Sequence, residues 1–330
     1  MILKRNYSKK IFISSLLILF STFLFCATAK YQDENFSLIV NYTETVTPGD
    51  AIFVRLNIQP TGELKKHKSE IATNSLLQLI KDKKEIDKSS FYSISKSKKS
   101  NNIEVLAGIP LSSWLKNANY SIKVTFNLSN NKFKEFELPL TFTEKTFFEE
   151  TIELDEKNTE IKTDNSPKRA VQIDKLNSIL FTVMPSDVYS LGKMTVPTDS
   201  TRYTSYFGDR RTYAYTNGNS STSIHHGNDY GAPTATPINS WAAGRVVMAE
   251  DRISTGYSVV IEHLPGLYSL YYHLSELLVK EGDMIKQGEL IGKSGATGLA
   301  TGPHLHWEMR LNGASVRPEF FLSNFTFEQE

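Results

Sequence analysis

The first half of the chain is dominated by an alternation of apolar and polar residues. Four segments are rich in β-branched and aromatic residues, and several of them show this alternation: Phe36–Tyr42, Ala51–Asn57, Tyr120–Phe126 and Phe133–Phe142. A period of two places the apolar side chains on one face of a strand. Pro48-Gly49-Asp50 separates the first two segments with residues typical of a turn. We therefore predict a small β-sandwich-like domain over residues 30–145, in which no catalytic constellation is visible.

Residues 146–195 have the pattern of a connector that contains a helix. Asn165-Ser166-Pro167 combines a capping residue with a proline in the first turn, which is typical of a helix start. Apolar residues then recur near helical spacing, and Pro185 follows: Ala170, Ile173, Leu176, Leu180 and Val183. This stripe predicts a short connecting helix that packs against a neighbouring domain.

After residue 195 the pattern changes to short strands punctuated by glycine. Fifteen of the 18 glycines follow residue 190, and six of the seven histidines follow residue 224. Strands are predicted at Trp241–Ala249, Tyr257–His263, Leu267–His273 and His304–Arg310. The chain is thus predicted to be all-β, with a second β domain over residues 196–322 and a tail over residues 323–330.

The N-terminus has the three-part pattern of a secretory signal peptide. Four basic residues lie among the first ten, an apolar run of 15 residues follows over Ile11–Phe25, and Ala27-Thr28-Ala29 is an A-x-A cleavage site. The run is short for a membrane span, which needs ~20 residues. We predict a signal peptide over residues 1–29, cleavage before Lys30, and no stable membrane insertion afterwards. The alternatives are an uncleaved anchor helix and lipid attachment at Cys26, which the bulky Phe25 opposes.

Cysteine content and charge narrow the chemistry of the predicted mature chain. Cys26 is the only cysteine, so cleavage before Lys30 removes every thiol and excludes disulfides and thiolate ligands. Any zinc site must then use histidine and carboxylate. The mature chain would carry 33 basic and 36 acidic residues, a net charge of −3. Neither this balance nor the +1 of the full chain indicates a nucleic-acid partner.

Four histidines and one aspartate recur at metal-compatible spacings within 82 residues. His225 and Asp229 form an H-x-x-x-D sequence whose intervening glycine and asparagine oppose a helix, so a loop or strand end should present both. In His304-Leu305-His306 the two histidines share one side of a strand, with Cα atoms ~6.6 Å apart. A catalytic zinc ion needs three protein ligands and an open position for water. His225, Asp229 and one of the two strand histidines could supply them, with the other histidine and His273 close to the water.

Further short motifs accompany these residues in order along about 120 residues. They are Thr204-Ser205-Tyr206-Phe207-Gly208-Asp209-Arg210-Arg211, Ala232-Pro233, Tyr272-His273-Leu274, Gly282-Asp283, Thr297-Gly298 and Thr301-Gly302-Pro303-His304-Leu305-His306-Trp307-Glu308. The series resembles the lysostaphin/LytM-type zinc endopeptidases, which cleave peptidoglycan peptides. The resemblance does not extend to residues 30–145.

This resemblance implies a compact antiparallel β domain of the duplicated-hybrid-motif type, with a groove across one sheet. It also implies a Zn²⁺ cofactor and a role for each residue of the site. His225, Asp229 and His306 would be the zinc ligands, His273 and His304 the catalytic residues, and Asn217, in the loop before His225, a substrate contact.

The chain is therefore interpreted as an exported zinc endopeptidase that hydrolyses peptide cross-links of bacterial peptidoglycan. Peptidoglycan peptides are its expected partners, and the periplasm, the cell envelope or the medium its expected location. One alternative is a non-catalytic module that binds the wall or activates another wall hydrolase. Such a module should lack a ligand, and none of the five residues is missing. A second alternative is a peptidase of proteins outside the wall.

Overall fold

The structure is a computed structural model that describes residues 17–19, 26–32, 34–67, 75–95, 102–129, 132–192, 194–323 and 327. Over these residues strands predominate, which confirms the predicted β class. The chain divides into two compact units. The first contains residues 1–45, 53–108 and 118–141, and the second residues 46–52, 109–117 and 142–330. None of the helices in the described ranges has the length and apolar character needed to span a membrane.

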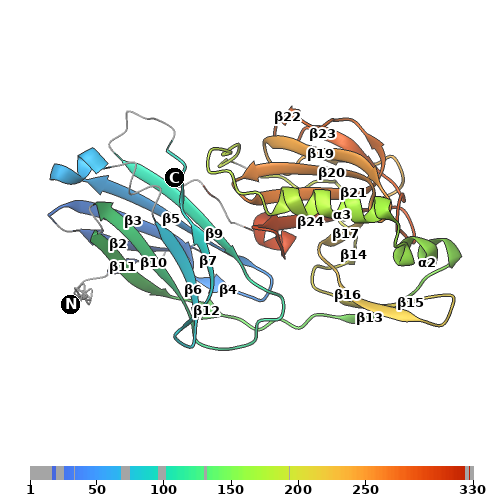
Figure 1. The fold of residues 1–330 in the computed structure, drawn as a ribbon, viewed down its shortest axis with the longest axis horizontal. Coiled ribbons are helices and arrows are strands. Elements are labelled where there is room, and N and C mark those ends of the chain that lie inside the picture. The colour runs from blue at the N-terminus through green and yellow to red at the C-terminus, as the bar shows by residue number, and fades with distance from the viewer. Residues whose placement is uncertain are drawn as a thin grey trace, which may run out of the picture. The chain divides into compact units, whose positions relative to one another are not determined.

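The first unit is built from two sheets (Figure 1). One has the strand order β1-β2-β3-β5-β9-β8 and the other the order β11-β10-β6-β7. Their bounds are β1 Leu17–Leu19, β2 Cys26–Gln32, β3 Phe36–Thr43, β5 Ala51–Pro60, β6 Leu76–Lys81, β7 Lys84–Ser90, β8 Tyr92–Ser93, β9 Ile103–Pro110, β10 Tyr120–Ser129 and β11 Lys132–Pro139. β4 (Thr45–Val46) pairs with β12 (Thr141–Phe142), and a 3-10 helix covers Gly62–His67.

Apolar residues of the two sheets meet in the interior of this sandwich. Along β3 every second side chain is buried, as the alternation predicts. Phe36 of β3 packs edge-on against Phe126 of β10, with ring centroids 5.5 Å apart. Such T-shaped pairs add to the free energy of burial because the positive edge of one ring meets the negative face of the other. The core of the first unit is therefore the space between its two sheets.

The predicted signal peptide falls only partly on described residues. Residues 1–16 and 20–25 lie outside them, whereas Ala27 and Ala29 are buried side chains of β2. β2 pairs with β3 along its whole length, from Cys26 opposite Thr43 to Gln32 opposite Ser37. Cleavage before Lys30 would leave only the last three residues of this strand, and it stays a prediction.

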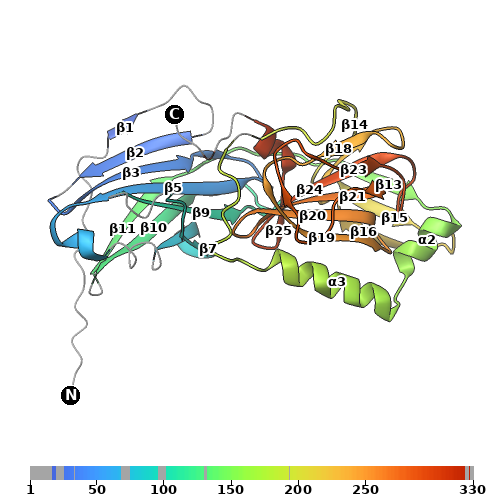
Figure 2. The same ribbon diagram turned by 90° about the horizontal axis from the view of Figure 1, so that it is seen from above.

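The second unit contains a ten-stranded sheet and a three-stranded sheet (Figure 2). The path of the large sheet is β14-β17-β24-β21-β20-β19-β22, with β18, β23 and β25 paired beside it, and the small sheet has the order β13-β15-β16. The bounds are β13 Glu149–Glu153, β14 Tyr203–Ser205, β15 Arg210–Ala214, β16 Ser220–Ile224, β17 Asn228–Gly231, β18 Pro237–Asn239, β19 Gly244–Arg252, β20 Gly256–Leu264, β21 Leu267–Leu277, β22 Met284–Ile285, β23 Leu290–Ser294, β24 His304–Leu311 and β25 Ala314–Val316. A 3-10 helix, Pro318–Leu322, follows.

In the described part of the chain, α2 (Glu156–Thr163) and α3 (Pro167–Leu180) precede the large sheet in sequence. The predicted start of α3 is confirmed, since Ser166 caps it by accepting a hydrogen bond from the Arg169 backbone N–H at 3.2 Å. Its last turns pack Leu176, Ile179 and Leu180 on buried residues of β19, β20 and β21. The helix ends at Leu180, five residues before Pro185, so the proline is not its terminator.

Candidate metal centre and groove

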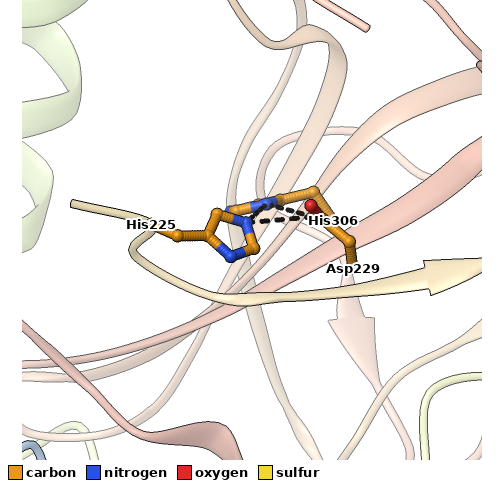
Figure 3. A group of neighbouring side chains, drawn as sticks. All are labelled: His225, Asp229 and His306. Carbon is orange, nitrogen blue, oxygen red and sulfur yellow. Dashed lines mark hydrogen bonds and ion pairs between the residues drawn. The ribbon is translucent and has the colours of Figure 1, made fainter. Parts of the chain in front are cut away.

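Three side chains of the second unit converge on one point (Figure 3). His225 Nε2 lies 3.1 Å from Asp229 Oδ1 and 3.0 Å from His306 Nδ1, and the latter two atoms are 2.8 Å apart. All three residues are buried. Nitrogen and oxygen ligands at 2.0–2.2 Å from a tetrahedral zinc ion lie roughly 3.3 Å from one another. A shift of a few tenths of an ångström would therefore open this cluster enough for a metal ion.

The sheet itself positions two of these residues. Asp229 of β17 and His306 of β24 are directly opposed in the antiparallel ladder, so their side chains share one face. His225 lies in the loop before β17, where its backbone N–H donates to the Asp209 carbonyl at 2.8 Å. Asp229 lies 77 positions before His306 and reaches it through strand pairing, whereas His225, 81 positions before His306, reaches it from a loop.

In His225 and His306, the ring nitrogen that points away from the cluster determines whether the nitrogen inside the cluster carries a proton or a lone pair. His225 Nδ1 lies 2.8 Å from the Tyr206 carbonyl oxygen, an acceptor, so this nitrogen carries the proton and Nε2 is left with a lone pair. His306 Nε2 lies 3.2 Å from Glu308 Oε1, which leaves Nδ1 as an acceptor in the neutral ring. Three acceptors facing one another repel unless a cation or a proton lies between them. The donor set therefore fits a divalent metal, with the outer partners orienting each ring.

The pKa values of the three cluster residues show which of them are charged in the absence of metal. Burial lowers the pKa of His225, so its ring is neutral near pH 7. Burial also opposes the charged form of His306, but hydrogen bonds with Asp229 and Glu308 outweigh it and raise its pKa to about 9. For Asp229, burial raises the pKa, whereas the neighbouring imidazoles of His225 and His306 bring it well below its usual range. Without metal, a proton on His306 takes the place of the cation.

His304 and His273 lie beside the cluster without being part of it. Their ring centroids are 4.7 Å apart, and His304 Nε2 is 3.8 Å from Asp229 Oδ1. Each Nδ1 donates to a backbone carbonyl at 2.8 Å, that of Gly302 for His304 and that of Thr297 for His273. Both Nε2 atoms therefore carry lone pairs. Burial lowers the pKa of both rings, for His273 to about 3, so both are neutral near pH 7.

A local backbone irregularity brings His273 to this place. Tyr272 is the ladder partner of His306 and stacks on its ring, with centroids 5.5 Å apart. In a regular strand the next residue would point to the opposite face. His273 has a φ of +60°, which is uncommon for a residue other than glycine and lets two successive side chains face the cluster. Such conformations persist where the surrounding structure imposes them, and they cluster at functional sites.

Two further charged residues contact the cluster, and the sequence predicted no role for either. Arg211 of β15 donates to Asp229 Oδ2 at 3.0 Å. Glu308 receives a hydrogen bond from Arg310 Nε at 2.7 Å and so is held against His306. The signal for Glu308 was present in the sequence, because residues 304, 306 and 308 share one face of a strand.

The cluster lies in a groove of about 320 Å³. Its lining includes His225, Asp229, His273, His304 and His306, so all five residues of the predicted centre border one space. Asn217 is not among the residues that line it. It lies in the exposed turn between β15 and β16, where its side-chain oxygen accepts from the Asn219 backbone N–H at 3.0 Å. Its contact with substrate stays a prediction.

Comparison with known proteins points to one class. Residues 223–318 match Peptidase family M23. The peptidoglycan DD-endopeptidase ShyC of Vibrio cholerae is 41% identical over 124 residues, which are 37% of this chain and 28% of that protein. The DD-carboxypeptidase/endopeptidase Mpg of Neisseria meningitidis is 43% identical over 95 residues, 29% of this chain and 22% of that protein. The chain thus spans about a quarter of the length of these relatives.

A solved structure described as an M23 peptidase from Pseudomonas aeruginosa shares the fold. It has a TM-score of 0.50 and 24% identity, and the match covers 76% of this chain and 89% of that one. The His-Asp-His cluster of the second unit lies within the residues that match this peptidase family. Residues 223–318 thus match peptidase family M23, which confirms the predicted resemblance to lysostaphin/LytM-type enzymes for this part of the chain.

Proposed function

We propose that this chain is a zinc-dependent endopeptidase that hydrolyses peptide cross-links of bacterial peptidoglycan. The observation that carries the proposal is the convergence of three acceptor atoms in a groove beside two neutral histidines. His225, Asp229 and His306 would hold the metal. The similarity to ShyC, a peptidoglycan DD-endopeptidase, supports peptidoglycan peptides as the substrate class.

Zinc, when bound, would polarise the peptide carbonyl and lower the pKa of a bound water toward ~7. The remaining chemistry belongs to His304 and His273. Because both rings are neutral with a lone pair on Nε2, either can accept a proton from water at that atom. The imidazolium so formed can then donate to the developing oxyanion or to the leaving amine. The backbone carbonyls of Gly302 and Thr297 fix both tautomers for this task.

We also propose that the protein is exported and that its peptidase domain spans residues 196–322. A periplasmic, envelope or extracellular location agrees with a wall substrate and with the N-terminal pattern described above. The sandwich-like domain over residues 30–145 and the connector over residues 146–195 would be the other parts of the mature chain.

The test is muropeptide analysis after purified protein has been incubated with isolated peptidoglycan. Loss of cross-linked muropeptides with zinc, and none after chelation, is the expected result. Circular dichroism of the chelated protein should retain the β signal, since the strand ladders hold the site. Binding to the wall without any new muropeptide would instead identify a non-catalytic module. Cleavage of unrelated proteins with the wall left intact would identify a peptidase of other substrates.

A further inference from the structure

One wall of the groove is formed by α2 and β13, which precede the segment that matches the family. β13 pairs in parallel with β15, and α2 follows it and lies beside the small sheet in both views (Figures 1 and 2). Two buried residues of α2 anchor the helix. Asn158 donates to the Ala300 carbonyl at 3.4 Å, in the loop before His304, and Thr159 accepts from the Thr216 backbone N–H at 3.4 Å.

The last turn of α2 directs Lys162 at this groove. Its ammonium lies over the Tyr213 ring, 4.0 Å from the centroid, and both side chains line the groove. Arg169 of α3 fixes the same turn by donating to the Lys162 carbonyl at 3.0 Å and to that of Asp164. These contacts satisfy carbonyls that a helix end otherwise leaves without partners. The position of Lys162 is therefore fixed by Tyr213 at its side chain and by Arg169 at its backbone carbonyl.

Lys162 also differs from Arg211, the arginine that lines the groove, in its ion-pair partners. Arg211 is committed to Asp229 and Glu150, at 3.0 and 2.8 Å. Among the described residues, the Lys162 ammonium has no carboxylate partner; burial lowers its pKa, and the charged neighbours that add to this effect are Arg169 and Arg211. Two cations, Arg169 and Arg211, and the face of the Tyr213 ring thus surround the half-buried Lys162 ammonium. This arrangement favours an anionic ligand.

We propose that Lys162 binds a carboxylate of the peptide substrate close to the bond that is cut. Lys162 lies over Tyr213, which shares one face of β15 with Arg211, two residues and about 7 Å away along the strand; Arg211 in turn pairs with Asp229 of the cluster. An extended peptide covers this distance in about two residues. The carboxylate is either a side chain or the C-terminus within that reach. This inference rests on the proposed peptidase function.

The experiment compares three synthetic wall peptides that differ only in their carboxylates, with zinc-loaded full-length protein. One peptide has every carboxylate free, one has a C-terminal amide, and one has an amidated side-chain carboxylate beside the scissile bond. Lys162→Met removes the charge and Lys162→Arg keeps it. Lys157→Met, on the exposed side of the same helix, is the matched control. Circular dichroism checks that each variant is folded.

The parent should prefer the free carboxylate over one of the two amides by about tenfold in kcat/KM, a ratio equivalent to 1.4 kcal/mol. The amide that loses activity identifies the source of the carboxylate. Lys162→Met should bring the ratio to within about twofold, whereas Lys162→Arg and Lys157→Met should preserve it. Equal rates on all three peptides, or an unchanged ratio in Lys162→Met, would overturn the inference while the peptidase function stands. Hydrolysis of no peptide and no wall would overturn both.

Discussion

Replacing His306 or His304 by alanine, one at a time, tests which of the two histidines binds the metal and which acts as an acid–base group. The two residues lie on one strand face, yet His306 Nδ1 is 2.8 Å from Asp229 Oδ1, whereas His304 Nε2 is 3.8 Å from that atom. His306→Ala leaves only two of three converging acceptors. His304→Ala leaves all three, together with the hydrogen bonds that orient them.

The expected magnitudes differ accordingly. Loss of a partner behind a metal ligand typically weakens metal affinity by about 10–100-fold. Loss of His306 itself should therefore weaken zinc binding by more than about 100-fold and remove activity with it. His304→Ala should keep about one zinc per chain, because the ligands remain. It should lower kcat by about 10²–10⁴, which is typical for the loss of one acid–base group.

The assay pairs metal analysis of each purified variant with a wall-hydrolysis rate under identical zinc. His226→Ala serves as the control for zinc content, because its Nδ1 lies 3.1 Å from Ser315 Oγ rather than at the cluster. If His304→Ala lost zinc while His306→Ala retained it, the ligand would be the other histidine. If both variants hydrolysed wall at the parent rate, the metallopeptidase mechanism would be wrong.

Four further outcomes are expected. Glu308→Gln should weaken zinc binding by about 10–100-fold in a titration, because the amide holds the His306 ring less firmly. Since the pKa of His306 is raised to about 9, zinc binding near pH 7.5 should release about one proton. The affinity for zinc should rise with pH up to about 9, and calorimetry in buffers of different ionisation enthalpy measures the number of protons released. Ser166→Ala should cost ~1 kcal/mol in urea unfolding through the lost cap of α3. Mass spectrometry of exported protein should give an N-terminus at Lys30, and a lipid-modified Cys26 would contradict this.

Much of the fold could be predicted from the sequence, because strands that are buried on one or both faces have a clear apolar pattern. β3, β20 and β21 include the predicted segments and extend them by one or more residues. α2 was missed, since Glu156–Thr163 has almost no apolar stripe. Its helix depends on the Asp155 cap, which accepts from the Asn158 backbone N–H at 2.7 Å, and on tertiary anchors that the sequence pattern does not reveal.

The sequence predicted which residues form the candidate site, but not the distances between them or their backbone geometry. Spacing alone placed His304 and His306 on one strand face and left them equivalent; only the structure gives their different distances to Asp229. The positive φ of His273 depends on contacts from elsewhere in the sheet, so no local signal marks it. The ion pair of Arg211 likewise arises from β15, which approaches the cluster through tertiary structure.

The wide separation of the cluster residues along the chain has a consequence for biosynthesis. His306 emerges from the ribosome 77 residues after Asp229, and the two meet only when β24 joins β17. Until that late, long-range pairing forms, a nascent chain has no complete metal centre. A chain truncated before β24 would lack His306 and with it one of the three converging atoms of the cluster.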